Sequence, residues 1–518
     1  MSSRGPDGLF SALFAGGRVA VGDEQWLQAI LDVEAALARA LERAGLAPAG
    51  AGGAVTGAAQ AGQFDSAELG RQAALTGNPV PAVVRALSAR LPPGPAGAVH
   101  RGATSQDIID TALMVLARQA LAGTLADLEA AAAAAAGLAA AHRDTVMIGR
   151  TLLQQAVPVT FGLVAAGWLT ALDEARRWLA RIQRDRLAVQ FGGAAGTLAS
   201  LGDAGPGVAV LLAEELGLGL PVLPWHTDRL RIVELASALA GACAALGKVG
   251  RDVTLLAQSE VAEVSEGDAG QPDGPGGPAR PGGQAGHGGQ ADPGGHARSG
   301  APGRPAGPDR RGGHAGLAAQ ADAGATGPDQ HGTRRGGSSA MPHKRNPVAA
   351  IVVLGCARQA PGLLASVMAS AEQELQRAAG AWHAEWQPLS GLLTLTGSAA
   401  AWAAQLLSGL RVDAARMRAN LEASGGLPLA ENVAALLAPA LGPLPAHDLV
   451  ARASSRATAA GGNLGEALRA SDLASQIAAA GITPEQVAAR LDPASYLGSA
   501  GRFVDAALAA HRAGEAGS

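Results

Sequence analysis

Apolar residues recur with helical spacing along most of the chain. In "EQWLQAILDVEAALARALERAGL" at 24–46 they fall at i, i+3, i+4 and i+7, which is one face of a helix. Longer runs of good helix formers predict five helices of about 30 residues, at 107–144, 158–192, 228–264, 347–375 and 389–423. No run of alternating β-branched residues stands out. We therefore expect an all-α protein with a long five-helix bundle that buries its remaining apolar surface by oligomerising.

One segment departs from this pattern. Residues 267–335 consist mostly of Gly, Pro, Ala, Arg, His, Gln and Asp, and Leu317 is their only large apolar residue. Such a composition buries too little apolar surface to offset its backbone entropy, so it predicts a disordered low-complexity insertion. A GC-rich gene read out of frame would give the same alphabet, and the residues alone leave both origins open. The irregular spacing of its histidines argues against a metal site.

Composition and charge narrow the class of protein. The chain has 518 residues, 48% of them hydrophobic, and a formal net charge of −4, which offers no basic surface for nucleic acid or an anionic membrane. We expect its apolar runs, such as 235–247, to be too short and too Ala-rich to cross a bilayer. Two cysteines are too few for a disulfide framework or a zinc site and suit a reducing cytoplasm. These features predict a soluble cytoplasmic protein.

The densest chemistry follows the low-complexity segment directly, in "GSSAMPHKRNP" at 337–347. Gly and Pro predict a loop that leads into the next helix. The free amides of a helix N-terminus, together with Lys344, offer positive charge to an anion. In such surroundings Ser338 or Ser339 can transfer a proton, because cation and amide donors stabilise the ionised hydroxyl. Lysine occurs only twice in the chain, so the lysine retained here is a candidate for a chemical role.

This string resembles the signature loop of the fumarase/aspartase superfamily, which includes adenylosuccinate lyases, argininosuccinate lyases and 3-carboxy-cis,cis-muconate cycloisomerases. Two further stretches support the resemblance, "HRGATSQDIIDTAL" at 100–113 and "QFGGAAGTLASLG" at 190–202. It covers nearly the whole chain apart from 267–335.

The resemblance implies a fold and an assembly. The fold would have three mostly helical domains, which we place at 1–100, 101–412 and 413–518, with the central domain holding the five-helix bundle. Four bundles would form a twenty-helix core in a homotetramer. Each active site would combine residues from three subunits, so a single chain would be inactive.

The stretch "GRTLLQQAVPVTFG" at 149–162 separates branches of the superfamily. Adenylosuccinate lyases typically carry a His shortly after the Arg-Thr pair, which protonates the departing amine, whereas Leu152, Leu153 and Gln154 follow the pair here. The string resembles the "RTxLQQA" pattern of bacterial 3-carboxymuconate cycloisomerases, although Trp is common at the position of Leu152. A carboxylate needs no such proton donor, because its acid has a pKa of about 4 and it attacks or leaves as the anion. Three more stretches resemble that branch, 224–229, 379–389 and 426–442.

The resemblance implies lactonisation of a small tricarboxylate, 3-carboxymuconate, to 4-carboxymuconolactone in protocatechuate (β-ketoadipate) catabolism. Ser338 would donate the proton to carbon while Lys344 and Asn346 hold the aci-carboxylate, and Ser339 would add its amide or hydroxyl. The remaining substrate contacts would come from His100, Thr104, Ser105, Arg150, Gln154 and Met341. Neither a metal nor an organic cofactor is implied.

Other roles compete with these assignments. Thr104 and Ser105 can cap the helix that follows them, and Arg150 can form a structural ion pair. For the whole protein, one alternative is an adenylosuccinate-lyase-like C–N eliminase, which the missing His disfavours. The other is an inactive tetrameric scaffold, because 267–335 adjoins the loop that carries Ser338.

Overall fold

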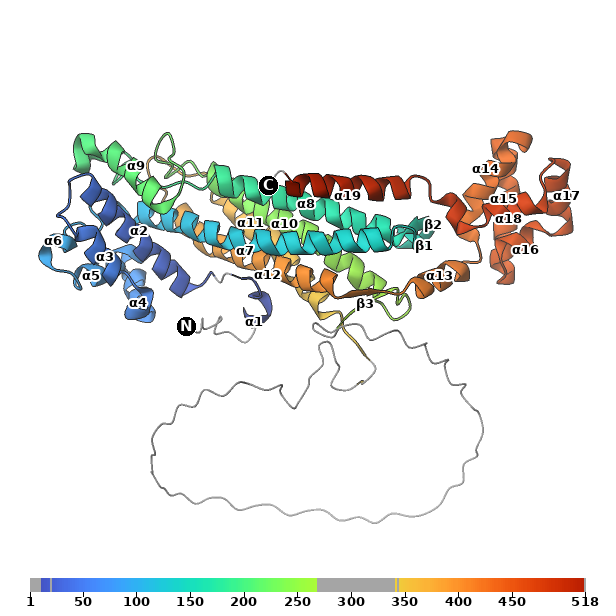
Figure 1. The fold of residues 1–518 in the computed structure, drawn as a ribbon, viewed down its shortest axis with the longest axis horizontal. Helices are drawn as coiled ribbons and strands as arrows, with labels where there is room; N and C mark the ends of the chain where they lie inside the picture. Colours follow the sequence, from blue (N-terminus) through green and yellow to red (C-terminus); the bar gives the residue numbers. More distant parts are fainter. Residues whose placement is uncertain (1–10, 19–20, 268–340, 342–343, 517–518) are drawn as a thin grey trace, which may run out of the picture.

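Long helices dominate the computed structural model of the chain, which describes residues 11–18, 21–267, 341 and 344–516. Within these residues, five helices of 22 to 37 residues run side by side in an elongated bundle (Figure 1). They are α7 (Ser105–Ala141), α8 (Phe161–Asp185), α10 (Leu230–Leu256), α11 (Val348–Ala369) and α12 (Ala381–Ser408). The predicted helical class and the five long helices are confirmed. The disorder predicted for 267–335 lies, from 268 onward, outside the described residues.

The helix expected at 389–423 has the wrong bounds. α12 starts earlier and ends at Ser408, after which the chain forms strand β4 (Leu410–Val412) and helix α13 (Ala414–Ala423). The carboxylate of Asp413 caps α13 by accepting a hydrogen bond from a backbone amide at 2.8 Å. Apolar residues continue through the break with helical spacing, so periodicity alone merged the two helices.

Small residues let the bundle helices pack closely. Ala131, Ala135 and Ala139 of α7 are fully buried in its core. At the start of α8, a Cβ on Gly162 would come within 2.6 Å of the Arg143 backbone. The distance between packed helices depends on the side chains at their contact, so faces of Ala and Gly bring the backbones together.

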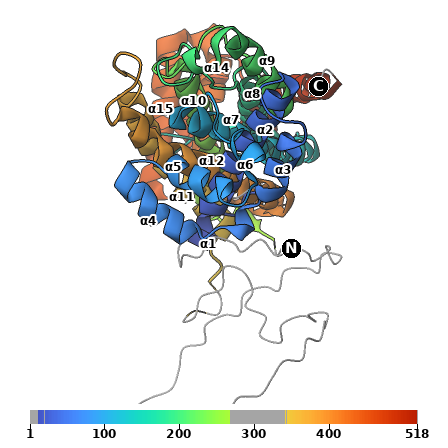
Figure 2. The ribbon, with the colours of Figure 1, turned by 90° about the vertical axis from the view of Figure 1, so that its left-hand side faces the viewer.

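Shorter helices surround the N-terminal end of α7, and Figure 2 views them along the long axis. Apart from α6 (Pro93–Ala96), they share a hydrophobic core with Ile108 and Leu116 of α7. They are α2 (Asp23–Arg43), α3 (Ala51–Ala58), α4 (Ser66–Thr76), α5 (Val80–Ser88), α6 (Pro93–Ala96) and α9 (Gly205–Leu216), with 3-10 turns η1 (Ala61–Gln63) and η2 (Ala199–Ala204). A single turn, α1 (Ser11–Phe14), contacts α11 and α12.

A separate hydrophobic core lies at the opposite end of the molecule, around Val433, Leu449 and Leu464 (Figure 1). Its elements are α14 (Ala430–Leu441), α15 (Pro443–Ala460), α16 (Leu464–Leu468), α17 (Ser471–Ala479), α18 (Pro484–Arg490), η3 (Leu427–Leu429) and η4 (Pro493–Tyr496). The last helix, α19 (Ala500–Ala516), runs back along α8. We retain the domain boundaries at 100 and 412 as a proposal, in which α9 and α19 each pack against a neighbouring domain.

Two small antiparallel sheets were not predicted. β1 (Val146–Thr151) and β2 (Gln154–Thr160) form a hairpin after α7, and β3 (Val264–Glu266) pairs with β4. The hairpin turn consists of Leu152 and Leu153, with φ of 52° and 63° and exposures of 96% and 70%. Large apolar residues rarely adopt this left-handed conformation or stand so fully in water.

Three bundle helices, α7, α10 and α11, are long and apolar enough to cross a membrane by length and composition. The expectation that the apolar runs are too short is therefore wrong. The most apolar stretches of α7 and α10 are 72% and 56% buried within the bundle, but that of α11 is only 33% buried. A single chain thus leaves much of the apolar surface of α11 uncovered.

Candidate active site

At the N-terminal end of α7, three motifs found in the sequence meet around the carboxylate of Asp107. Its Oδ1 accepts a hydrogen bond from the amide of Gly192 at 3.0 Å and lies 2.7 Å from Nε2 of His226. Its Oδ2 accepts hydrogen bonds from the amides of Gly193 and Thr104 at 2.9 and 3.0 Å. Asp107 is 1% exposed, so these partners replace the water that the carboxylate has lost. They also fix the loop that carries Thr104 and Ser105.

Two glycines permit this close approach. Gly102 has a φ of 82°, and a Cβ there would come within 2.5 Å of Leu201. A Cβ on Gly192 would come within 2.8 Å of the His226 ring. Larger residues at either position would push the motifs apart.

His100 is held by a buried carboxylate that we did not predict. Oε1 of Glu34 in α2 lies 2.7 Å from Nδ1 of His100, and Oε2 accepts a hydrogen bond from the His100 amide at 2.8 Å. Glu34 is fully buried, whereas the His100 side chain is 23% exposed. Burial opposes protonation of the ring, but the hydrogen bond and charge of Glu34 and the charge of Asp107 outweigh it and raise the pKa of His100. His100 is therefore a partly exposed group with an enhanced tendency to carry positive charge.

One turn further along α7, a second charged cluster is buried deeper. The guanidinium of Arg229 donates to both carboxylate oxygens of Asp110 at 2.8 and 3.1 Å and to both of Glu385 at 2.6 and 3.1 Å. Trp382 donates its indole N–H to Asp110 at 3.0 Å. All four side chains are at least 93% buried. Two carboxylates share one cation here, and burial raises the pKa of Glu385 to about 7 although the Arg229 charge lowers it.

A further cation, Arg377, covers this end of the bundle. Its guanidinium donates to the side-chain oxygen of Gln106 in α7 at 3.1 Å and to the carbonyl of Ala194 at 3.0 Å. Arg377 thereby ties the glycine-rich turn to the first residues of α7. It adds positive charge beside the loop of Thr104.

The hairpin end of the bundle holds Arg150 in an ion pair. Arg150 donates two hydrogen bonds to the carboxylate of Glu263, at 2.9 and 2.7 Å, and Glu263 is fully buried. Asn420 of α13 donates to the same carboxylate at 2.9 Å. The structural ion pair considered for Arg150 therefore forms within one chain. Its contact with substrate remains a proposal.

Gln154 lies at the tip of the same hairpin. It is the first residue of β2, is exposed, and pairs with Thr151 across the turn. The turn between them contains Leu152 and Leu153, whose side chains cannot transfer a proton.

The N-terminus of α11 differs from our expectation. Glu266 of β3 accepts hydrogen bonds from the amides of Ala349 and Ala350 at 3.1 and 2.9 Å. The chain's own carboxylate thus occupies amides that we expected to be free for a bound anion. Lys344, just before the helix, is exposed, and Asn346 is partly buried.

Of the candidate loop at 337–347, the structure describes Met341 and residues 344–347. Met341 is 42% exposed. Ser338 and Ser339 lie outside the described residues, so their predicted roles stay predictions.

One chain divides the candidate residues into two groups. The first, at the N-terminal end of α7, contains His100, Thr104 and Ser105; the second, toward its C-terminal end, contains Arg150, Gln154, Lys344 and Asn346. β3 connects the members of the second group, since Glu263 before it holds Arg150 and Glu266 at its end caps α11. A helix of 37 residues is about 55 Å long, so α7 keeps the first group far from the hairpin that carries Arg150 and Gln154, as Figure 1 shows. A small substrate reaches only one group within a single chain.

Acidic residues are what we missed. Six carboxylates were assigned no role, although each binds a histidine, an arginine or the first amides of a helix in the structure. They are Glu34, Asp107, Asp110, Glu263, Glu266 and Glu385. A signal was present for some of them: Glu34 interrupts the apolar face of its helix, where a charge is rare unless it is paired.

Comparisons with known proteins agree with this architecture. Sequence profiles match for a family described as "Lyase" over residues 18–275 and for "Adenylosuccinate lyase C-terminus" over 426–507. A 3-carboxy-cis,cis-muconate cycloisomerase of Bradyrhizobium diazoefficiens is 43% identical over 95% of both chains. A nitrosuccinate lyase of Streptomyces davaonensis is 40% identical over 97% of this chain and 94% of its own.

A solved structure is similar as well. The crystal structure of 3-carboxy-cis,cis-muconate lactonizing enzyme from Pseudomonas putida superposes with a TM-score of 0.79 at 37% identity, over 98% of this chain and 99% of that one. The matched profiles, the sequence identities and the near-complete coverage of both chains show that the chain belongs to the fumarase/aspartase superfamily of lyases. Within it, the chain falls in the group that includes the 3-carboxy-cis,cis-muconate cycloisomerases.

Proposed function

We propose that this chain is a 3-carboxy-cis,cis-muconate cycloisomerase, which closes 3-carboxymuconate to 4-carboxymuconolactone in protocatechuate (β-ketoadipate) catabolism. The observation that carries the proposal is the β1–β2 turn. Leu152 and Leu153 stand where an amine-expelling relative needs a proton donor, and neither can serve as one. The attacking group in lactonisation is a carboxylate, which needs no proton transfer at oxygen. The relatives named above include enzymes with this activity.

The reaction joins a carboxylate oxygen to one carbon of the diene and delivers a proton to the neighbouring carbon. Because the attack is intramolecular, no entropy is lost in bringing two reactants together. Negative charge develops on the carboxylate next to the protonated carbon, and one well-placed donor there contributes about 10²–10³ in rate. In our proposal Ser338 delivers the proton, and Lys344, Asn346 and Ser339 stabilise that charge.

The other substrate carboxylates are bound, in this proposal, by His100, Thr104, Ser105, Arg150 and Gln154, with Met341 against the carbon skeleton. Protonated His100 suits a carboxylate, and Glu34 favours that protonated form. Arg150 already neutralises Glu263, so we expect its attraction for substrate to be the weakest of the charged contacts.

We further propose a cytoplasmic homotetramer with active sites shared between subunits and no cofactor. Two features support this assembly. The two groups of candidate residues lie toward opposite ends of α7, a helix about 55 Å long, so one chain does not complete a site. The apolar surface of α11 and the exposed Leu152 and Leu153 are the kind of surface that an interface covers.

Turnover of purified protein on 3-carboxymuconate and, in parallel, on adenylosuccinate tests the proposal. We expect loss of 3-carboxymuconate with no cleavage of adenylosuccinate; the reverse result would favour the C–N eliminase. Replacing Ser338 with Ala should lower kcat by about 10² or more, because the carbon loses its proton donor. An unchanged kcat would remove Ser338 from the mechanism without affecting the assignment of the activity.

A second candidate comes from the relative named as a nitrosuccinate lyase. Nitrite, like a carboxylate, departs as an anion, so the absence of a proton donor in the β1–β2 turn fits its elimination too. Nitrite release from nitrosuccinate, faster than lactonisation, would favour this activity. A folded tetramer that turns over none of the three substrates would favour the inactive scaffold.

A further inference from the structure

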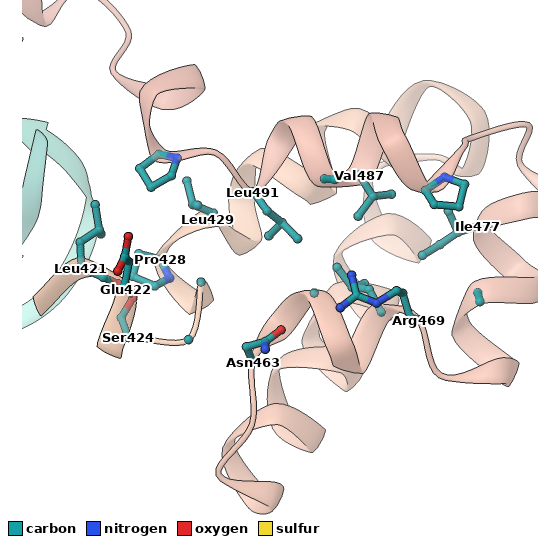
Figure 3. A pocket seen from close by; sticks show the side chains of 18 of the residues that line it. Leu421, Glu422, Ser424, Pro428, Leu429, Asn463, Arg469, Ile477, Val487 and Leu491 are labelled. Atoms are coloured by element: carbon teal, nitrogen blue, oxygen red, sulfur yellow. Dashed lines mark hydrogen bonds between the residues drawn. The ribbon is translucent and has the colours of Figure 1, made fainter. Parts of the chain in front are cut away.

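A pocket of about 420 Å³ opens among the C-terminal helices, between α13, η3, α16, α17 and α18 (Figure 3). Cavities of this size commonly hold small molecules. None of the candidate active-site residues that the structure describes lines it. The pocket is therefore a separate feature of the fold, built by the helices beyond the bundle.

The walls of the pocket are mostly apolar. Figure 3 shows Leu429, Leu491 and Val487 along one side. Small side chains at Ala474 and Ala478, on α17, leave space that larger residues would fill. Such walls favour the apolar body of a ligand over water.

Among the described lining residues, one cation, Arg469, has no charged partner. Arg469 and Asn463 lie on the opposite side of the pocket in Figure 3. Within the described residues, the guanidinium of Arg469 makes no hydrogen bond or ion pair. The other charges of the lining, Arg418 and Glu422, neutralise one another in an ion pair of 2.7 Å. The pocket therefore carries one uncompensated positive charge beside an apolar wall.

We propose that this pocket binds a small amphipathic organic anion, with a ring or short hydrocarbon body and one carboxylate. The body would lie against the leucine and valine side chains, and the carboxylate would accept hydrogen bonds from Arg469. A guanidinium presents paired N–H donors that match a carboxylate, which explains the preference for this anion. The inference does not depend on the activity proposed above.

Calorimetric titration of the full-length protein with 2-naphthoate tests the site, and neutral 2-naphthamide serves as the matched probe. We expect saturable binding of one 2-naphthoate per chain. Arg469→Gln should weaken 2-naphthoate about tenfold, the value of one charge-assisted contact, and leave 2-naphthamide unchanged. Arg452→Gln is the matched control, because it removes an exposed charge from the same region, outside the pocket. Within the described part of the chain, the side chain of Arg452 forms one hydrogen bond, to neutral Gln476.

Filling the pocket gives an independent test. Ala478→Trp should abolish binding of both probes, and Ala474→Leu, a milder change, should weaken both. The proposal is overturned if the unmodified protein shows no saturable binding of 2-naphthoate. A pocket that is already filled by a second copy of the chain would give this result. The proposal is also overturned if both filled variants bind as well as the original, or if Arg469→Gln and Arg452→Gln have equal effects.

Discussion

The two ends of the helical bundle differ in how their charged and apolar side chains are accommodated. At the N-terminal end of α7, the buried charges of Asp107, Asp110 and Arg229 are matched by partners within the same chain. At the hairpin end, Leu152 stands 96% exposed in a left-handed conformation. A buried charge must be paired when the chain folds, whereas an exposed apolar side chain can be covered later by another subunit. Within the chain, the charges at one end are paired, whereas apolar side chains at the other end stay exposed, and the tetramer that we propose would cover them.

The largest expected effect is a loss of folding stability when the buried charge cluster at the N-terminal end of α7 loses its cation. Arg229→Met leaves Asp110 and Glu385 without their cation, and removing one partner of a buried ion pair costs about 3–5 kcal/mol. We expect a marked fall in the thermal unfolding midpoint, measured at one protein concentration. Arg456→Gln is the control, because its ion pair with Asp472 is exposed and contributes about 0–1 kcal/mol. Equal losses in the two variants would contradict the comparison.

A smaller effect concerns the pH dependence of stability. The folded-state pKa of Glu385, about 7, lies above its ordinary value of 4.5, so its contribution to stability is complete below about pH 4.5 and is lost as the pH rises through about 7. Glu385→Gln removes this titration while keeping the side-chain shape. The unmodified protein should therefore lose stability relative to the variant between pH 5 and pH 8. If the difference between the unfolding midpoints of the two proteins stays constant from pH 5 to pH 8, the raised pKa of Glu385 does not contribute to stability.

A moderate effect on substrate binding is expected when the charge of Glu34 is removed. Glu34→Gln keeps a polar contact to His100 but removes the charge, so the pKa of His100 should fall. If protonated His100 binds a substrate carboxylate, KM at pH 7 should rise several-fold, roughly the effect of one charged contact, with kcat little changed. The difference in KM between the two proteins should narrow as the pH falls, because a growing fraction of His100 is then protonated in the variant as well. Glu24→Gln, at the exposed start of the same helix, should leave the pH profile unaltered.

The smallest effect on the single chain is expected at the hairpin. Leu152→Asp changes a side chain that is 96% exposed, so its own contribution to folding should shift by only about 0.5 kcal/mol. If another subunit covers the turn, sedimentation velocity should show dissociation to smaller species, with loss of turnover at low protein concentration. Ser455→Asp, at an exposed position on the far C-terminal helix α15, provides a control for an added surface charge. An intact assembly in both variants would place Leu152 outside the interface.

Local periodicity was sufficient to predict the long helices, because the apolar face of a helix such as α7 or α10 repeats within a few residues along the chain. It failed at the hairpin, where β2 runs directly into α8 and the turn uses leucines rather than Asn or Gly. It also failed at 409–413, where α12 gives way to β4 although the apolar spacing continues.

Short motifs in the sequence identified the superfamily, the helical class and the chemical types of the candidate residues, because these depend on neighbours along the chain. The tertiary structure alone decided which charges meet. Glu34 and His100 are 66 residues apart and Asp110 and Trp382 are 272 apart, and no local pattern specifies such pairs. It also placed the loop of Thr104 and the ion pair of Arg150 at opposite ends of α7, because a rigid 37-residue helix keeps its ends apart.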